Sequence, residues 1–91
     1  MGFTKEDAIE RARQDLAARI STSDAEIREE SVEDVDFPDM ALGAGAADEM
    51  SGQMITPGWR IRLNANDKTF EYRANRNQIR LFNYHGANYR I

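Results

Sequence analysis

The chain has a single histidine, His85, and no cysteine, so few of its side chains could perform catalysis. General acid-base or nucleophilic catalysis needs a base that is poised near neutral pH beside a nucleophile. His85 lies in the polar segment 84–88, and a lone histidine in such a segment is typical of a solvated surface residue. We therefore predict that the protein is not an enzyme.

The acidic and glycine residues do not follow the spacing of a metal or cofactor site. Adjacent carboxylates occur at 29–30, 33–34 and 48–49, but neighbouring residues of a strand point to opposite faces. The segment 34–39 has three aspartates without the third alternating acid or the glycine of a calcium loop. The Gly-x-Gly at 43–45 lacks the further residues of a phosphate-binding loop. We expect no cofactor and no metal.

Arginines alternate with apolar residues in the last third of the chain, a period of two that predicts strands. If Trp59, Ile61 and Leu63 face a helix, five side chains share the opposite face of the sheet: Arg60, Arg62, Arg73, Arg80 and Phe82. Such a face could bind single-stranded nucleic acid by charge and stacking. The competing interpretation is a solvated face that is partly paired with acidic residues.

The segment 38–58 is long for a loop in so small a domain, and long loops tend to be functional or disordered. Prolines and glycines punctuate it throughout. Its apolar side chains are candidates for a partner-binding surface: Met40, Leu42, Met50, Met54 and Ile55. Methionine adapts to varied partner surfaces. The alternative is that these side chains fold back over the open sheet face and complete the core.

One N-terminal helix is expected over residues 5–20. Thr4 is a suitable N-cap, although Asp7 stands where a capping box usually has Glu or Gln. Apolar residues at spacings of three and four form a thin stripe: Ile9, Ala12, Leu16 and Ile20. A helix with so thin a stripe must lie on a sheet to be stable.

The sequence as a whole predicts one α+β domain over residues 1–91, with the helix on an antiparallel sheet of about four strands. We expect the first strand at about 27–37, the loop at 38–58 and a three-stranded meander at 59–83. The tail, 84–91, is expected to be loosely held.

The charge is unevenly distributed along the chain. Residues 1–57 carry 5 basic and 14 acidic side chains, a net charge of −9, whereas residues 58–91 carry 7 and 2, a net charge of +5. This pattern indicates either a basic binding surface or acidic and basic segments that lie side by side. There is no apolar run of about 18 residues and no signal-peptide pattern, so we expect a cytoplasmic protein that does not bind membranes.

Three segments, 37–43, 55–63 and 70–72, carry a resemblance to a known group. They resemble small uncharacterised bacterial proteins with the approximate pattern Trp-Pro-Asp-x-Ser-Leu-Gly-Cys, then Thr-Pro-Gly-Tyr-x-Ile-x-Leu, then Tyr-x-Tyr-His. The likeness spans most of residues 8–82 and implies a shared fold without an established activity. The chemically reactive positions of the pattern are replaced in this chain by the following residues: Phe37, Ala41, Ala44 and Arg73. The loss of cysteine fits a reducing compartment.

Taken together, these features favour a non-catalytic protein-interaction module that uses the loop or the sheet face. Single-stranded nucleic-acid binding through the arginine face is the alternative. The partner could be another protein or a second copy of this chain.

Overall fold

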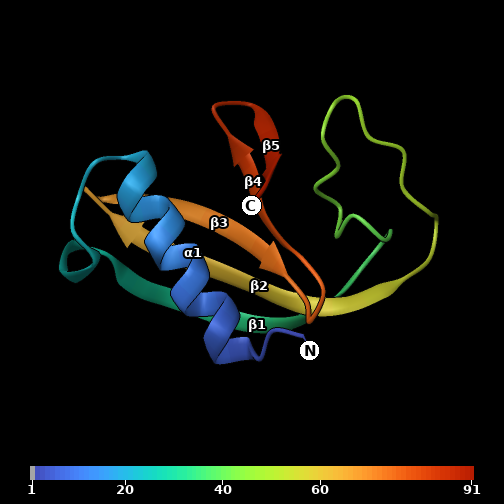
Figure 1. The fold of residues 1–91 in the computed structure, drawn as a ribbon, viewed down its shortest axis with the longest axis horizontal. Helices are drawn as coiled ribbons and strands as arrows, with labels where there is room; N and C mark the ends of the chain where they lie inside the picture. The colour runs from blue at the N-terminus through green and yellow to red at the C-terminus, as the bar shows by residue number, and fades with distance from the viewer. Residues whose placement is uncertain (1) are drawn as a thin grey trace.

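The computed structural model describes residues 2–91, which form one helix, a short 3₁₀ turn and five strands (Figure 1). Their bounds are α1 Lys5–Arg19, η1 Asp24–Glu26, β1 Arg28–Phe37, β2 Thr56–Ala65, β3 Lys68–Ala74, β4 Ile79–Tyr84 and β5 Ala87–Arg90. The strands form one antiparallel sheet in the order β1-β2-β3-β4-β5. The α+β class is therefore confirmed, but the sheet has five strands rather than about four. No helix within residues 2–91 is long and apolar enough to cross a membrane.

α1 begins at a complete capping box. The Thr4 hydroxyl accepts a hydrogen bond from the Asp7 N–H at 3.1 Å, and the Asp7 carboxylate accepts one from the Thr4 N–H at 3.1 Å. Asp7 thus replaces the Glu or Gln that most capping boxes have at this position, because the otherwise unpaired N–H groups of Thr4 and Asp7 both find a side-chain acceptor. Arg19 in the last turn complements the negative end of the helix dipole.

The core lies between α1 and one face of the sheet. The buried helix residues are Ala8, Ala12, Leu16 and Ala17, whereas Ile9 and Ile20 of the predicted stripe are only partly buried at its margin. Small side chains at the centre of this face leave room for the sheet's large ones, of which Tyr72 is fully buried. The Tyr72 hydroxyl donates to Asp15 on α1 at 2.7 Å. Burial and the adjacent Asp15 carboxylate raise the pKa of Tyr72 well above its ordinary value.

Two tight hairpin turns connect the later strands. Asn66 and Asp67 join β2 to β3 with φ angles of 54° and 60°, and His85 and Gly86 join β4 to β5 with φ angles of 51° and 83°. Two consecutive residues with positive φ match the right-handed twist of the flanking strands. The expectation of a loose tail at 84–91 is therefore wrong, because the second turn folds the chain back into the strand β5.

β2 begins at Thr56, earlier than the predicted start of the meander at residue 59. Its first residues pair only with β1, because the pairing with β3 ends at Trp59 and Ala74. Pro57, which has no N–H to donate, is therefore tolerated there. A Cβ on Gly58 would lie 2.5 Å from the carbonyl oxygen of Ala74, so glycine is required at this close approach.

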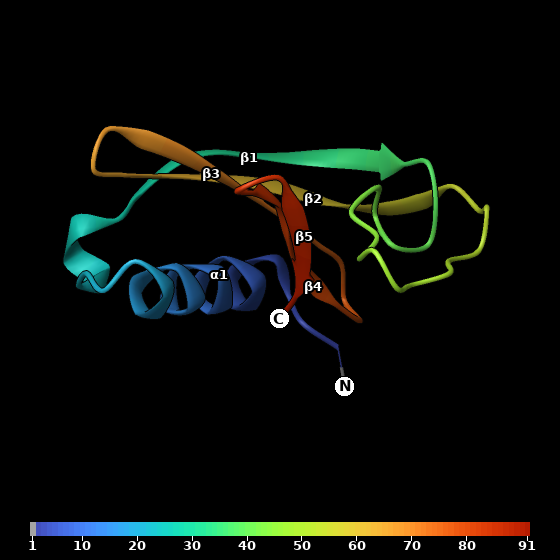
Figure 2. The ribbon, with the colours of Figure 1, turned by 90° about the horizontal axis from the view of Figure 1, so that it is seen from above.

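The sheet is strongly twisted, and its two faces are covered by different parts of the chain. Figures 1 and 2 show α1 on one side of the β4–β5 end of the sheet and the loop 38–55 on the other. Among residues 2–91, β2 is the only strand that pairs with β1, so β1 forms a free edge of the sheet. Most of its outward side chains are acidic and exposed: Glu29, Glu30, Glu33, Asp34 and Asp36.

Candidate functional site

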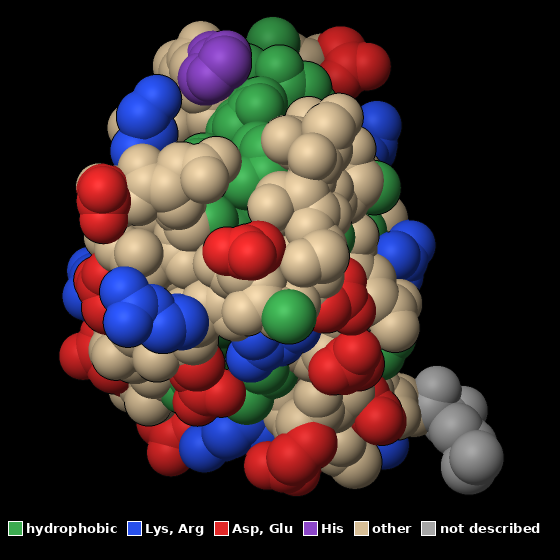
Figure 3. Space-filling view, turned by 90° about the vertical axis from the view of Figure 1, so that its left-hand side faces the viewer, with side chains coloured by type: hydrophobic (Ala, Val, Ile, Leu, Met, Phe, Trp, Pro, Cys, Tyr) green, Lys and Arg blue, Asp and Glu red, His purple; other side chains and the backbone are tan. Residues whose placement is uncertain are grey.

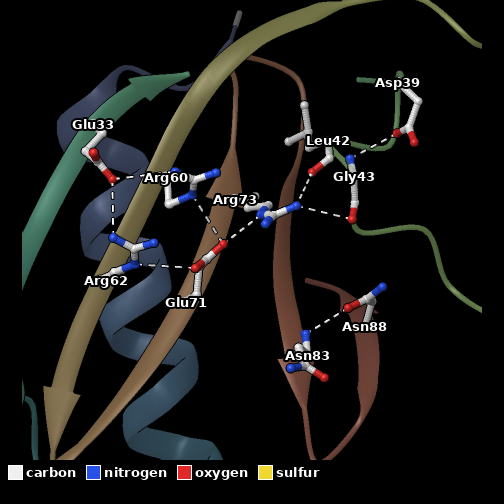
Figure 4. A network of polar contacts seen from close by, with 10 residues as sticks. All are labelled: Glu33, Asp39, Leu42, Gly43, Arg60, Arg62, Glu71, Arg73, Asn83 and Asn88. Carbon is white, nitrogen blue, oxygen red and sulfur yellow. Dashed lines mark hydrogen bonds and ion pairs between the residues drawn. The ribbon is translucent and has the colours of Figure 1, made fainter. Parts of the chain in front are cut away.

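A network of ion pairs covers the sheet face that points away from α1 (Figure 4). Glu71 on β3 accepts hydrogen bonds from Arg62 Nε at 3.4 Å and from Arg73 Nε at 2.8 Å, and it lies 3.4 Å from Arg60 Nε. Glu33 on β1 lies 3.6 Å from Arg60 and 3.4 Å from Arg62. The acidic and basic segments of the chain therefore lie side by side, as one of the two charge interpretations predicts.

Arg73 joins this network to the loop. Its Nη1 donates to the main-chain carbonyl oxygens of Leu42 and Gly43 at 3.1 and 3.2 Å (Figure 4). The same guanidinium lies over the Phe82 ring, with its central carbon 3.6 Å from the ring centroid. A cation that stacks on an aromatic face and donates to carbonyls holds both partners in place. The loop is thus fastened over the end of the arginine face.

Arg80 makes the second connection between sheet and loop. It is 6% exposed, and its two terminal nitrogens bind both carboxylate oxygens of Glu49 at 2.5 and 2.7 Å. Glu49 also accepts a hydrogen bond from the Ala46 N–H at 3.0 Å. These hydrogen bonds, led by the one from Arg80, lower the pKa of Glu49 to about 2. The pair fixes residues 46–49 on β4.

The first part of the loop is itself a compact turn. Asp39 Oδ1 accepts hydrogen bonds from the N–H groups of Ala41 and Gly43 at 2.9 and 3.0 Å. Positive φ angles of 59° at Leu42 and 65° at Gly43 direct the Leu42 side chain inward, and it is fully buried. Leu42 is therefore not available to a partner. It folds back into the core, as the alternative to partner binding predicts for the apolar side chains of this loop. A hydrogen bond of 3.0 Å from the Met40 N–H to the Gly52 carbonyl closes the loop.

The other four apolar candidates remain outside the core. Met40 is 50% exposed, Met50 98%, Met54 63% and Ile55 70%. Met40 lies against the second part of the loop, since a Cβ on Gly52 would be 2.6 Å from its sulfur. We call these four side chains the exposed loop patch.

The five residues of the nucleic-acid hypothesis do share one face, but the structure leaves little of that face open. Arg60 and Arg62 are paired with Glu33 and Glu71, whereas Arg73, Arg80 and Phe82 contact one another or the loop. Arg80 in particular is buried, so it could not reach a phosphate in this conformation. Sequence reasoning missed the roles of Asp39, Glu49 and Glu71. The signal for Asp39 was local, since an aspartate after proline favours a turn that its own side chain closes, whereas Arg80, the partner of Glu49, is distant in the sequence.

Among the hollows on the surface of the described residues, two are large. One, of about 720 Å³, lies between β3 and β4 and includes Phe70, Tyr84 and His85. The other, of about 760 Å³, lies at the Thr56–Trp59 end of β2. The His85 ring stacks on Tyr84 with centroids 4.2 Å apart. Within residues 2–91 no group of three His, Asp or Glu side chains is arranged to hold a metal ion.

Comparison with known proteins places the chain in a family defined by its sequence. Residues 9–83 match the model of DUF8738, a domain of unknown function. The chain belongs to this family. No curated protein and no solved structure matches the chain significantly. The DUF8738 match covers α1 from Ile9 onward, the first four strands up to Asn83 and the whole loop, so the loop and its anchors Arg73 and Arg80 are part of the family domain.

Proposed function

We propose that this DUF8738 protein is a non-catalytic protein-interaction module that binds its partner through the exposed loop patch. One observation carries the proposal. Four of the six large hydrophobic side chains exposed among the described residues belong to the loop 38–55: Met40, Met50, Met54 and Ile55. Scattered exposed apolar residues are ordinary, but their concentration on one loop is typical of an interaction site.

The attachment of the loop to the sheet supports the same function. Arg73 and Arg80 hold main-chain and side-chain groups of the loop, and Asn88 donates to the Gly45 carbonyl at 2.9 Å. The patch is therefore presented by a pre-organised loop, which reduces the entropy lost when a partner binds. Methionine side chains on a fixed backbone still adapt to the shape of an apolar partner surface.

Catalysis is not part of the proposal. The lone histidine stacks on Tyr84, and the carboxylates Glu33, Glu49 and Glu71 are engaged by arginines. The absence of cysteine suits a partner in the reducing cytoplasm. A partner with an apolar surface fits the patch best, and a second copy of this chain or a nucleic acid is a competing outcome of the experiment below.

The test is affinity capture from a lysate of the source organism at moderate salt, with and without nuclease, using the wild type and the variant Met50→Ser/Met54→Ser as baits. Phe3→Ser is the matched control, because Phe3 is an exposed hydrophobic residue outside the loop. The captured protein is then purified and its affinity measured with each variant. We expect the double variant to bind about tenfold more weakly and the control to bind normally.

Two results would contradict the proposal. If the double variant binds the purified partner as tightly as the wild type, the patch is not the contact. If capture disappears with nuclease, the arginine face and not the patch would be the binding surface.

A further inference from the structure

β3 and β4 pair along only part of their length. Their register runs from Ala74 and Ile79 to Glu71 and Phe82, and β3 then continues through Lys68–Phe70 without a partner on this side. In Figure 1 the two strands leave their common turn like the arms of a V. The hollow of about 720 Å³ lies between these arms. We call it the strand gap.

The cause of the divergence is local to β4. Asn83 adopts a positive φ of 53°, and its N–H donates to the Asn88 side chain on β5 at 2.7 Å (Figure 4). The β4–β5 register shifts at the same point, between Leu81 and Tyr84. A shift of this kind bends a strand and increases its twist. β4 therefore turns toward β5 and leaves the outer part of β3 open.

The register determines which main-chain groups face the strand gap. Ala65 and Lys68 close the two-residue hairpin between β2 and β3, so they form a hydrogen-bonded pair. Pairs in an antiparallel ladder alternate, and therefore Thr69, opposite Asn64, directs its N–H and C=O away from β2. The next residue of β3 that directs its main-chain groups away from β2 is Glu71, which pairs with Phe82 of β4. Thr69 has no paired residue in β4. Its donor and acceptor both point into the gap.

Apolar side chains line the gap beside these polar main-chain groups. Ile20, Phe70, Leu81 and Tyr84 contribute to it, and Figure 3 shows hydrophobic side chains gathered along a furrow near the single histidine. Its volume falls within the range of ligand-binding pockets. The chain's own C-terminal residue does not occupy it, since the Ile91 N–H is bonded to the Ile79 carbonyl at 3.0 Å.

We propose that the strand gap binds an extended peptide segment of a partner, which adds a strand beside residues 68–70 of β3. The N–H and C=O of Thr69 need an acceptor and a donor on a neighbouring strand, and an extended peptide main chain supplies both. In the bound peptide, the two residues that flank the one paired with Thr69 direct their side chains to the same face of the sheet as Phe70. The peptide should therefore have apolar residues on both sides of that central position. This site is separate from the exposed loop patch and does not depend on it.

The probe is a display library of random nine-residue peptides, selected on the wild-type protein and then synthesised. Amide hydrogen exchange by NMR reports directly on Thr69. We expect its N–H to exchange rapidly in the free protein and about tenfold more slowly when a selected peptide saturates the site. An analogue methylated at the central peptide nitrogen should lose most of its affinity, because it cannot donate to Thr69.

Thr69→Pro is the matching change in the protein, since it removes an N–H that makes no bond to β2, and Thr69→Val is its control because valine keeps that N–H. We expect binding to fall about tenfold in the proline variant and to change less than about twofold in the valine variant. If the proline variant does not fold, the methylated peptide still tests the pairing, because it removes the other hydrogen bond of the same pair, from the peptide N–H to the Thr69 carbonyl. The proposal is wrong if Thr69 is already protected in the free protein, or if no selected peptide slows its exchange.

Discussion

Removal of the Glu49 carboxylate should destabilise the protein by about 2 kcal/mol. Breaking a buried ion pair costs about 3–5 kcal/mol and an exposed one at most about 1 kcal/mol. Arg80 is almost fully buried and the Glu49 side chain is 14% exposed, so the pair lies between these limits. Glu49→Gln keeps one acceptor oxygen but no charge, which leaves the Arg80 guanidinium without its counter-ion. For a domain of this size the melting temperature should fall by about 10 °C.

The pH dependence gives an independent check of the same pair. The pKa of Glu49 is lowered from 4.5 to about 2 in the folded protein, so its contribution is present above pH 4.5 and is lost as the pH falls toward 2. The difference in unfolding free energy between wild type and Glu49→Gln should therefore be constant at pH 5–7 and about half or less at pH 3.

Urea unfolding followed by Trp59 fluorescence measures both effects. Asp48→Asn is the control, because Asp48 is an exposed neighbour with the same charge. Equal stability of the Glu49→Gln and Asp48→Asn variants, or a difference between them that does not change with pH, would refute the assigned role of Glu49.

Three further substitutions test the fold. Gly58→Ala should destabilise by about 3 kcal/mol in urea unfolding, because the new Cβ would meet the Ala74 carbonyl at 2.5 Å; a neutral effect would contradict the close approach. Tyr72→Phe should cost about 1–2 kcal/mol, because it removes the 2.7 Å hydrogen bond to Asp15, and Asp15→Asn on top of it should add only the loss of the Asp15–Arg19 ion pair, at most about 1 kcal/mol. Thr4→Ala should cost about 1 kcal/mol and increase amide exchange in the first turn of α1, whereas an unchanged first turn would speak against the capping box.

The parts of the fold that the sequence predicts are those that depend on periodicity. The alternation of Arg60 and Arg62 with Ile61 and Leu63 placed the arginines on one face, and the structure has them there. The strand β5 was missed because it is short and polar, so its signal was limited to the turn at His85 and Gly86.

The path of the loop could not be derived in the same way. Arg73 and Arg80 bind main-chain carbonyls of residues 42–44, and every residue has such a carbonyl. The sequence leaves Leu42 between a partner-binding surface and the core, because nothing in its type reveals a positive φ, which is rare for leucine. The pairing of Arg80 with Glu49 joins residues 31 positions apart, and many other acidic residues were equally available in the sequence.

The acidic edge of the sheet has a consequence for behaviour at high concentration. A ten-residue strand with a free edge could recruit the same strand of another molecule and start a fibre. Two copies of β1 would bring Glu29, Glu30 and Asp36 of each molecule together, and this repulsion opposes growth at neutral pH. The barrier is electrostatic and therefore conditional: acidification or concentrated salt removes it. We therefore expect fibre growth through β1 to be opposed at neutral pH and low salt and to be favoured by acid or concentrated salt.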